Sequence, residues 1–333
     1  MKRRAFLGLF VFKLALTAFA AWFVVTRVDL SDAISTLSRI DLLFVSAAVI
    51  CALAQIWLAS ERFVFVTGMV GSRVRQGDAM RITFIGAFFS QAFATFVSGD
   101  LMRVWLLARH GPGYRASAAA VLIDRVFGIA ALMVLILVGS PLLFDVLPSL
   151  DMRASVAAVT AAFIGMIGGF IALGWLLEPA RRRWPLLSSP RFAWLADFAG
   201  AARYVLAAPA KTVCALLLGL AVHLLSVASI YLLFRGLGTT VAAVSCFLFV
   251  PFVMLIAMLP LSFAGWGLRE GAMVAAFGTA GVASEVTLVV SITFGLVILA
   301  VSLPGLALWL TGAARMPITP PANEALSTSQ AEL

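Results

Sequence analysis

Long apolar runs alternate with short polar segments along this chain of 333 residues. A membrane-spanning helix needs about 20 predominantly apolar residues, and a charged, Gly-rich or Pro-rich break marks where one span ends and the next begins. The pattern predicts an all-α polytopic membrane protein. Its six full spans are expected at residues 5–26, 42–60, 116–138, 153–177, 212–234 and 285–310.

The apolar segment at residues 79–108 is interrupted by Gly99, Asp100 and Arg103, and it fits a re-entrant helical hairpin better than a full span. If residues 79–97 crossed the membrane, the arginine run 181–183 would lie outside, against the positive-inside rule. The piece at 101–108 is also too short to cross as a helix. A hairpin that enters from the cytoplasm and turns at Gly99 resolves both conflicts.

Residues 241–260, the motif PLSFAGWGLREG and residues 272–280 repeat this layout and predict a second hairpin, which enters from the outer side. With the six spans, the chain then has about eight hydrophobic segments. Broken backbone at membrane depth is tolerated where it is buried in protein or lines a wet cavity. Both hairpins therefore mark a candidate binding site.

An internal repeat supports this plan. When the second half of the chain is aligned on the first with Phe263 on Phe96, Leu268 falls on Leu101, and the dipeptide Phe-Gly at 294–295 falls on the one at 127–128. The two copies lie in opposite orientations in the predicted topology. Inverted repeats with broken helices are a recurring plan of transporters.

Composition agrees with the apolar pattern: 63% of the residues are hydrophobic, 12% are charged, and the mean hydropathy is +1.08. Residues 1–315 are expected to form one integral membrane domain and residues 316–333 a disordered cytoplasmic tail, with both termini in the cytoplasm. The most basic connection, 178–211, is expected to be a cytoplasmic loop rather than an amphipathic helix on the lipid surface.

The net charge of +9 does not indicate nucleic-acid binding, because most Lys and Arg residues lie between the spans, where they set the topology. The cysteines Cys51, Cys214 and Cys246 all fall in apolar segments without metal-ligand spacing. We expect no metal site and no cofactor.

Charged residues inside or beside the apolar segments carry the candidate chemistry. Ionisable groups at membrane depth cost several kcal/mol unless they are paired or hydrated, so each marks a candidate functional site. Neutral hydrogen bonds are expected from Ser90, Gln91 and Ser98 of the first hairpin. The candidate substrate-binding residues are Asp100, Arg103, Asp124, Arg125, Arg269, Glu270, Gln91 and Ser90.

Neighbours on a helix point about 100° apart, so Asp124 and Arg125 need separate partners, as do Arg269 and Glu270. Pairing between the two hairpins and the Asp124 helix is therefore expected. The pairs would be Asp100 or Asp124 with Arg269, and Glu270 with Arg103 or Arg125. Arg suits a lipid phosphate, because its planar fork donates two hydrogen bonds at once.

A structural interpretation stays open beside the functional one. Buried Arg–carboxylate pairs often only lock helices together, and for Asp124 and Arg125 the two interpretations are equally favoured. Glu61 and Arg62, close to the end of a predicted span, are expected at the membrane interface.

Three stretches together resemble a known family: FFSQAFATFVSGDLMRVWLLARHG, AAAVLIDRVFG and PLSFAGWGLREGAMVAAFG. They are similar to the membrane region of lysylphosphatidylglycerol synthases and to its free-standing, flippase-like relatives. The resemblance covers nearly the whole chain and implies the translocating part without the soluble synthetic domain. It also implies a bacterial inner membrane location and a lipid partner: a phospholipid, or a polyprenyl-type or hopanoid-type lipid.

Three functions are compared. The first is translocation of an anionic phospholipid or lipid-linked intermediate. The second is a non-catalytic accessory subunit that presents a lipid to a separate glycosyltransferase or lipid-modifying enzyme. The third, an enzyme acting on lipid phosphates, is not expected, because the sequence has no DxD motif, no His cluster and no Cys–His pair.

Overall fold

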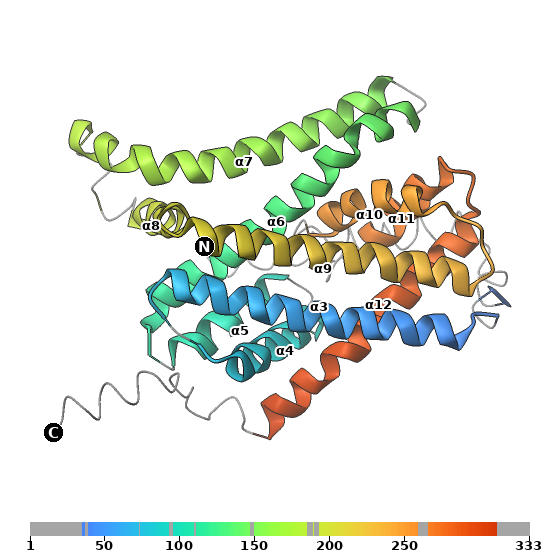
Figure 1. Cartoon of the computed structure of the whole chain (residues 1–333), viewed down its shortest axis with the longest axis horizontal. Helices are drawn as coiled ribbons and strands as arrows, with labels where there is room; N and C mark the ends of the chain where they lie inside the picture. The colour runs from blue at the N-terminus through green and yellow to red at the C-terminus, as the bar shows by residue number, and fades with distance from the viewer. Residues whose placement is uncertain are drawn as a thin grey trace, which may run out of the picture.

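The computed structural model describes residues 35–36, 39–72, 74–92, 96–109, 111–146, 150–184, 189, 193–258 and 266–311. Within these residues the chain forms ten α-helices and no strand, which confirms the predicted all-α fold (Figure 1). The predicted span 5–26 and the predicted tail 316–333 lie outside the described residues. The helices are α3 (Leu42–Met69), α4 (Gln76–Ala92), α5 (Phe96–Ala108), α6 (Gly113–Val146), α7 (Leu150–Arg183), α8 (Ala193–Ala207), α9 (Pro209–Gly236), α10 (Ala243–Ala257), α11 (Leu268–Gly278) and α12 (Ser284–Leu310).

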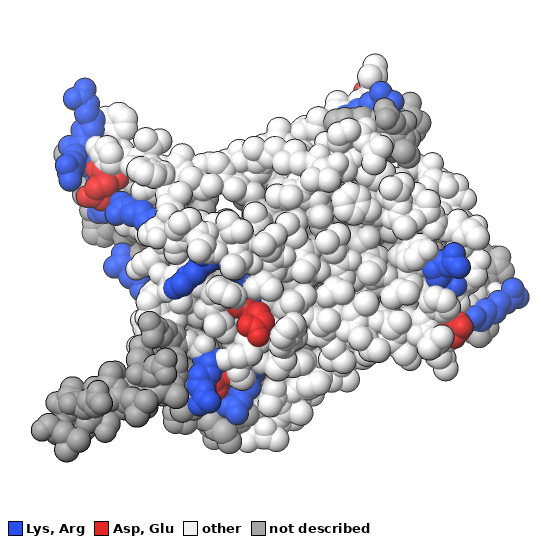
Figure 2. All heavy atoms as spheres, viewed as in Figure 1, with Lys and Arg blue, Asp and Glu red and all other residues white. Residues whose placement is uncertain are grey.

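Among the described helices, α3, α6, α7, α9 and α12 are long and apolar enough to cross a membrane. Each overlaps one predicted span, and each extends beyond it at one end or both. Helix α3, for example, continues past Ser60 to Met69, because the apolar stretch at 63–66 follows Glu61 and Arg62 and no helix breaker occurs before Gly68. Figure 2 shows charged side chains gathered towards the two ends of the molecule, with a broad uncharged band between them. The protein is a multi-pass membrane protein.

Five of the described helices are too short to span a bilayer: α8 and four others, which form two pairs. Helices α4 and α5 have 17 and 13 residues, and α10 and α11 have 15 and 11. The first pair connects the end of α3 to the start of α6, whereas the second connects the end of α9 to the start of α12. Since α3 and α9 run antiparallel and side by side, the two pairs enter the molecule from opposite ends (Figure 1).

The predicted turn of the first hairpin at Gly99 is wrong, because Gly99 lies inside helix α5. Its role there is close packing between α4 and α5: a Cβ at Gly99 would overlap Ser90 Oγ and the carbonyl oxygen of Gly86. Gly86 in turn makes room for the side chain of Arg103, whose Cγ would lie 2.6 Å from a Cβ at Gly86. Small residues at such crossings let membrane helices approach closely, and here they bring Arg103 into the middle of the bundle.

The internal repeat predicted from the sequence agrees with the helix boundaries. In the alignment that places Phe263 on Phe96, the first and last residues of α9 fall on the first and last residues of α3, and each helix has 28 residues. The first residue of α10 likewise falls on the first residue of α4. The antiparallel course of α3 and α9 makes the repeat an inverted one.

The connection 178–211 contains helix α8, so the prediction of a plain loop is wrong. Three small buried residues, Ala199, Ala201 and Ala202, give α8 a face that packs against α6 and α7. At the contact with α7, the Arg203 Nε donates to the carbonyl oxygen of Gly174, at 3.1 Å. The helix is therefore held by tertiary packing that the charge pattern does not reveal.

The end of the molecule at α8 is strongly basic. Helix α7 ends there with Arg181, Arg182 and Arg183, and Lys211 Nζ donates to the carbonyl oxygen of Gly68 near the end of α3, at 2.9 Å. At the opposite end, the backbone N–H of Asp41 donates to the carbonyl oxygen of Gly236, at 2.9 Å, and joins the start of α3 to the end of α9.

Candidate functional site

The first hairpin brings charged residues of three helices together in the interior. Helix α3 supplies Arg62, α5 supplies Asp100 and Arg103, and α6 supplies Asp124 and Arg125. Because α5 packs against both α4 and α6, its charged face turns towards α6 rather than towards lipid. We call these five residues the inner cluster.

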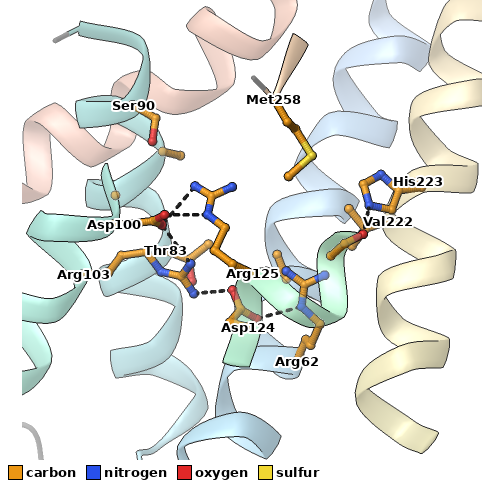
Figure 3. Close-up of a pocket in the computed structure, with 14 residues that line it drawn as sticks. Arg62, Thr83, Ser90, Asp100, Arg103, Asp124, Arg125, Val222, His223 and Met258 are labelled. Atoms are coloured by element: carbon orange, nitrogen blue, oxygen red, sulfur yellow. Dashed lines mark hydrogen bonds and ion pairs between the residues drawn. The ribbon is translucent and has the colours of Figure 1, made fainter. Parts of the chain in front are cut away.

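Two carboxylates connect the inner cluster (Figure 3). Asp124 accepts hydrogen bonds from Arg62 Nε at 2.7 Å and from Arg103 Nη2 at 2.8 Å. Asp100 accepts two from Arg125, from Nε at 2.5 Å and from Nη2 at 3.0 Å, and Arg103 Nη1 lies 3.7 Å from it. The prediction that Asp124 and Arg125 take separate partners is confirmed.

The inner cluster holds three guanidinium groups and two carboxylates, which leaves one positive charge in excess. The side chains of Arg62, Arg103 and Asp124 are at most 11% exposed, whereas those of Arg125 and Asp100 are 30% and 21% exposed. Uncompensated charge inside a membrane protein is costly. A negatively charged group that entered here would balance the cluster.

A cavity of about 200 Å³ borders the inner cluster and gives such a group a place. Within the described part of the chain, two polar atoms of its lining residues, Thr83 Oγ1 and Arg103 Nε, are buried and have no hydrogen-bond partner. Both can donate to an oxygen atom. The lining residues are Ala59, Arg62, Thr83, Gly86, Ala87, Ser90, Asp100, Arg103, Asp124, Arg125, Gly128, Val222, His223 and Met258.

On the far wall, Nε2 of His223 lies 3.0 Å from the carbonyl oxygen of Gly128, so this imidazole holds α9 against α6. Met258 faces the cavity from the end of α10 (Figure 3). Helices of both halves of the repeat therefore line the cavity.

Five of the eight predicted site residues line this one cavity: Ser90, Asp100, Arg103, Asp124 and Arg125. Gln91 is half-buried in α4 and is not among the lining residues. Arg62, which the sequence pattern places at the membrane interface, lies inside and contacts Asp124, so that expectation is wrong. The signal that identifies it is the apolar stretch after Arg62, which extends the helix and places this arginine well within α3.

Arg269 and Glu270 lie apart from the cavity and contact each other. Arg269 donates to Glu270 Oε1 from Nη2 at 2.6 Å and from Nε at 3.0 Å, and Ser291 Oγ donates to the same oxygen at 3.2 Å. The Arg269 guanidinium also lies 4.8 Å from the centre of the Trp266 ring, at the distance of a cation–π contact. We call Arg269, Glu270 and Ser291 the outer cluster.

The predicted pairing between the two hairpins is therefore wrong. Its premise is that adjacent residues point apart, but Glu270 is the third residue of α11 and turns back to accept a hydrogen bond from the backbone N–H of Gly267, at 2.5 Å. Gly267 has φ 84°, a conformation that favours glycine, and it caps the helix. This contact is the glutamate half of a capping box, and it brings the Glu270 carboxylate within reach of Arg269.

The chemistry available at the inner cluster is anion recognition. Guanidinium groups match the geometry of phosphate and carboxylate oxygens, and burial strengthens each contact. Among the described residues, no group of three or more His, Cys, Asp and Glu side chains could hold a metal ion.

A family model described as the lysylphosphatidylglycerol synthase TM region matches residues 10–305, which is most of the chain and includes both clusters. No curated protein matches the sequence.

Proposed function

Because this chain belongs to the lysylphosphatidylglycerol synthase TM region family, we propose that it moves an anionic lipid across the bilayer by way of the inner cluster. One observation carries the proposal: three arginines face two carboxylates at a cavity within the membrane-spanning bundle. The substrate is a phospholipid or lipid-linked intermediate with a phosphate in its headgroup.

The Arg125–Asp100 pair is the point at which the headgroup enters. It is the most exposed pair of the inner cluster, and its two hydrogen bonds to one carboxylate have the geometry that a phosphate also offers. A phosphate that displaces Asp100 keeps Arg125 paired, while Asp100 can turn to Arg103, whose Nη1 lies 3.7 Å from it in the structure. The exchange therefore leaves no bare charge in the interior.

The inverted repeat supplies a way to open the cavity to either side. In transporters built on this plan, one half of the repeat moves against the other around a site near the middle of the membrane. Here α3 and α9 form the most extensive interface among the described helices, and the cavity lies beside it, lined from both halves. By the positive-inside rule, the end with Arg181, Arg182 and Arg183 faces the cytoplasm of a bacterial inner membrane.

In this proposal the outer cluster fixes the second hairpin rather than binding substrate. Its arginine and carboxylate balance each other, and Arg269 and Glu270 are only 6% and 4% exposed. The sequence-based hypothesis that Arg269 and Glu270 also bind lipid stays a prediction. No step of the proposal breaks a covalent bond.

The test is lipid movement in vesicles of phosphatidylcholine that carry the purified protein and a trace of fluorescent phosphatidylglycerol. Dithionite added outside bleaches only outer-leaflet probe, so translocation shows as bleaching beyond the outer half. We expect fast bleaching with the wild type, a loss of at least tenfold in rate with Arg125→Gln, and a wild-type rate with Arg81→Gln. Arg81 pairs with Asp78 on its own helix and is 43% exposed, which makes it a matched control.

Equal rates for the wild type and Arg125→Gln would contradict the proposal. If the lipid binds in an Arg125-dependent manner but does not move, translocation is refuted and the accessory function is supported instead, in which the protein presents a lipid to a separate enzyme.

A further inference from the structure

An apolar groove runs between α6 and α7, beside the charged cavity. Its volume is about 280 Å³. Among the described residues that line it, a single one, Arg125, carries a charge. The others are Leu122, Val126, Ile129, Met166, Ile167, Gly169, Phe170 and Leu173.

Arg125 lines both the cavity and the groove, so the two spaces meet at its guanidinium. Its side chain is the most exposed of the three arginines of the inner cluster, at 30%. A molecule that reaches Arg125 from the groove therefore finds a cation at the end of an apolar channel. This order, apolar wall and then positive charge, matches the order of acyl chain and anionic headgroup in a lipid.

The groove exists because α7 is held by α8 and only weakly by α6. Gly174 packs so closely on α8 that a Cβ there would lie 2.9 Å from the Cβ of Ala202. Earlier in α7, a Cβ at Gly169 would meet nothing within 4 Å. Glycine at 169 thus leaves room between the helices where a larger side chain would fill it.

We infer that this groove holds an acyl chain of the transported lipid, with the headgroup phosphate at Arg125, so that the lipid enters sideways between α6 and α7. The inference rests on the proposed function and adds the route and the chain-binding site. A transmembrane helix of another protein is a poorer occupant, because the partly exposed Arg125 at the end of the groove would then face an apolar surface.

The experiment uses the full chain in phosphatidylcholine vesicles with a phosphatidylglycerol probe that carries a photoactivatable diazirine at the end of one acyl chain. After illumination, mass spectrometry locates the covalent adducts. We expect adducts concentrated on Ile167, Phe170 and Val126 in the wild type. Gly169→Leu fills the groove and should lower their yield at least fivefold.

Gly168→Leu is the matched control. Gly168 neighbours Gly169, also has nothing within 4 Å of a Cβ, and is not among the lining residues, so its adduct yield should equal that of the wild type. Adducts spread evenly over all lipid-facing helices, or equal losses in the two variants, would overturn the inference.

A second readout separates this inference from the proposed function. Glycerol 3-phosphate has the headgroup chemistry but no acyl chain, and it should raise the thermal stability of both the wild type and Gly169→Leu. If it stabilises both while the groove gives no selective adducts, the route is wrong and the headgroup site stands. If it stabilises neither, the headgroup site itself is wrong.

Discussion

The inner and outer clusters occupy equivalent places in the two halves of an inverted repeat, yet they differ in charge balance. In the alignment of the two halves, Ser291 falls on Asp124, Glu270 on Arg103 and Ser229 on Arg62. At the inner cluster, two arginines share Asp124 beside a cavity. At the outer cluster, one arginine and one glutamate form an ion pair with each other.

This difference shows how one scaffold position can serve two purposes. A buried ion pair with equal positive and negative charge needs no further ligand and only holds helices together. A buried cluster with one excess positive charge beside a cavity can instead bind an anion. Ser229, which takes the position of Arg62 in the second half, is buried, and its hydroxyl has no partner among the described residues. The second half thus carries a small neutral side chain where the first half carries Arg62.

The largest effect is expected from Asp124→Ala, which leaves both Arg62 and Arg103 without their shared carboxylate. Removing one partner of a buried pair costs about 3–5 kcal/mol, and two stranded cations place this variant at the upper end. The measurement is the melting temperature of the detergent-solubilised protein. Glu178→Ala is the control, since the Glu178–Arg203 pair is about half exposed and such pairs contribute about 0–1 kcal/mol. Equal melting temperatures for the two variants would show that Asp124 contributes no more to stability than a half-exposed carboxylate does.

The next effect concerns the outer cluster. Glu270→Gln leaves the buried Arg269 without its carboxylate partner and should lower the free energy of unfolding by about 3 kcal/mol. The double variant Arg269→Met with Glu270→Gln should recover most of this loss, because the amide oxygen still accepts from Gly267 and no charge remains buried. If the double variant instead stays as unstable as the single one, charge balance between Arg269 and Glu270 does not explain the stability of the outer cluster.

Replacing arginine by lysine tests the different roles of Arg125 and Arg269 without changing the charge of either cluster. Arg125→Lys loses the two-point geometry and should slow translocation of fluorescent phosphatidylglycerol by about tenfold, which corresponds to about 1.4 kcal/mol. Arg269→Lys should leave the rate per folded molecule unchanged. A slower rate in Arg269→Lys than in Arg125→Lys would reverse the assignment of the two clusters.

The smallest perturbation tests the inversion itself. In a background without Cys51, Cys214 and Cys246, single cysteines replace Arg109, after α5, and Ala280, after α11; both positions are exposed. A membrane-impermeant thiol reagent should label Arg109→Cys from the cytoplasmic side and Ala280→Cys from the other side, with no loss of stability. Labelling of both from one side would mean that the hairpins do not enter from opposite faces.

Much of the fold could be predicted from the sequence, because the length of an apolar run shows whether its helix can cross the hydrocarbon core of the bilayer. The run lengths predict the described long helices, and the short interrupted segments predict the two hairpins. Details that depend on packing could not be read in this way. Gly99 has the residue type of a turn, but its lack of a side chain serves contact between α4 and α5.

The site could be predicted in composition but not in pairing. Charge at membrane depth singles out every ionisable residue of the two clusters except Arg62, because burial makes such residues rare. Which of them meet depends on how α3, α5 and α6 face one another, and a single sequence does not contain that information. The apolar pattern predicts a helix end at Ser60 and so places Arg62 at the interface, whereas α3 continues to Met69 and carries this arginine into the interior.

The rise in melting temperature caused by glycerol 3-phosphate shows directly whether the inner cluster alone binds an anion. We expect the same rise for the wild type and for the double variant Arg269→Met with Glu270→Gln, and no rise for Arg125→Gln. A rise that persists in Arg125→Gln, or that disappears in the outer-cluster variant, would contradict this expectation.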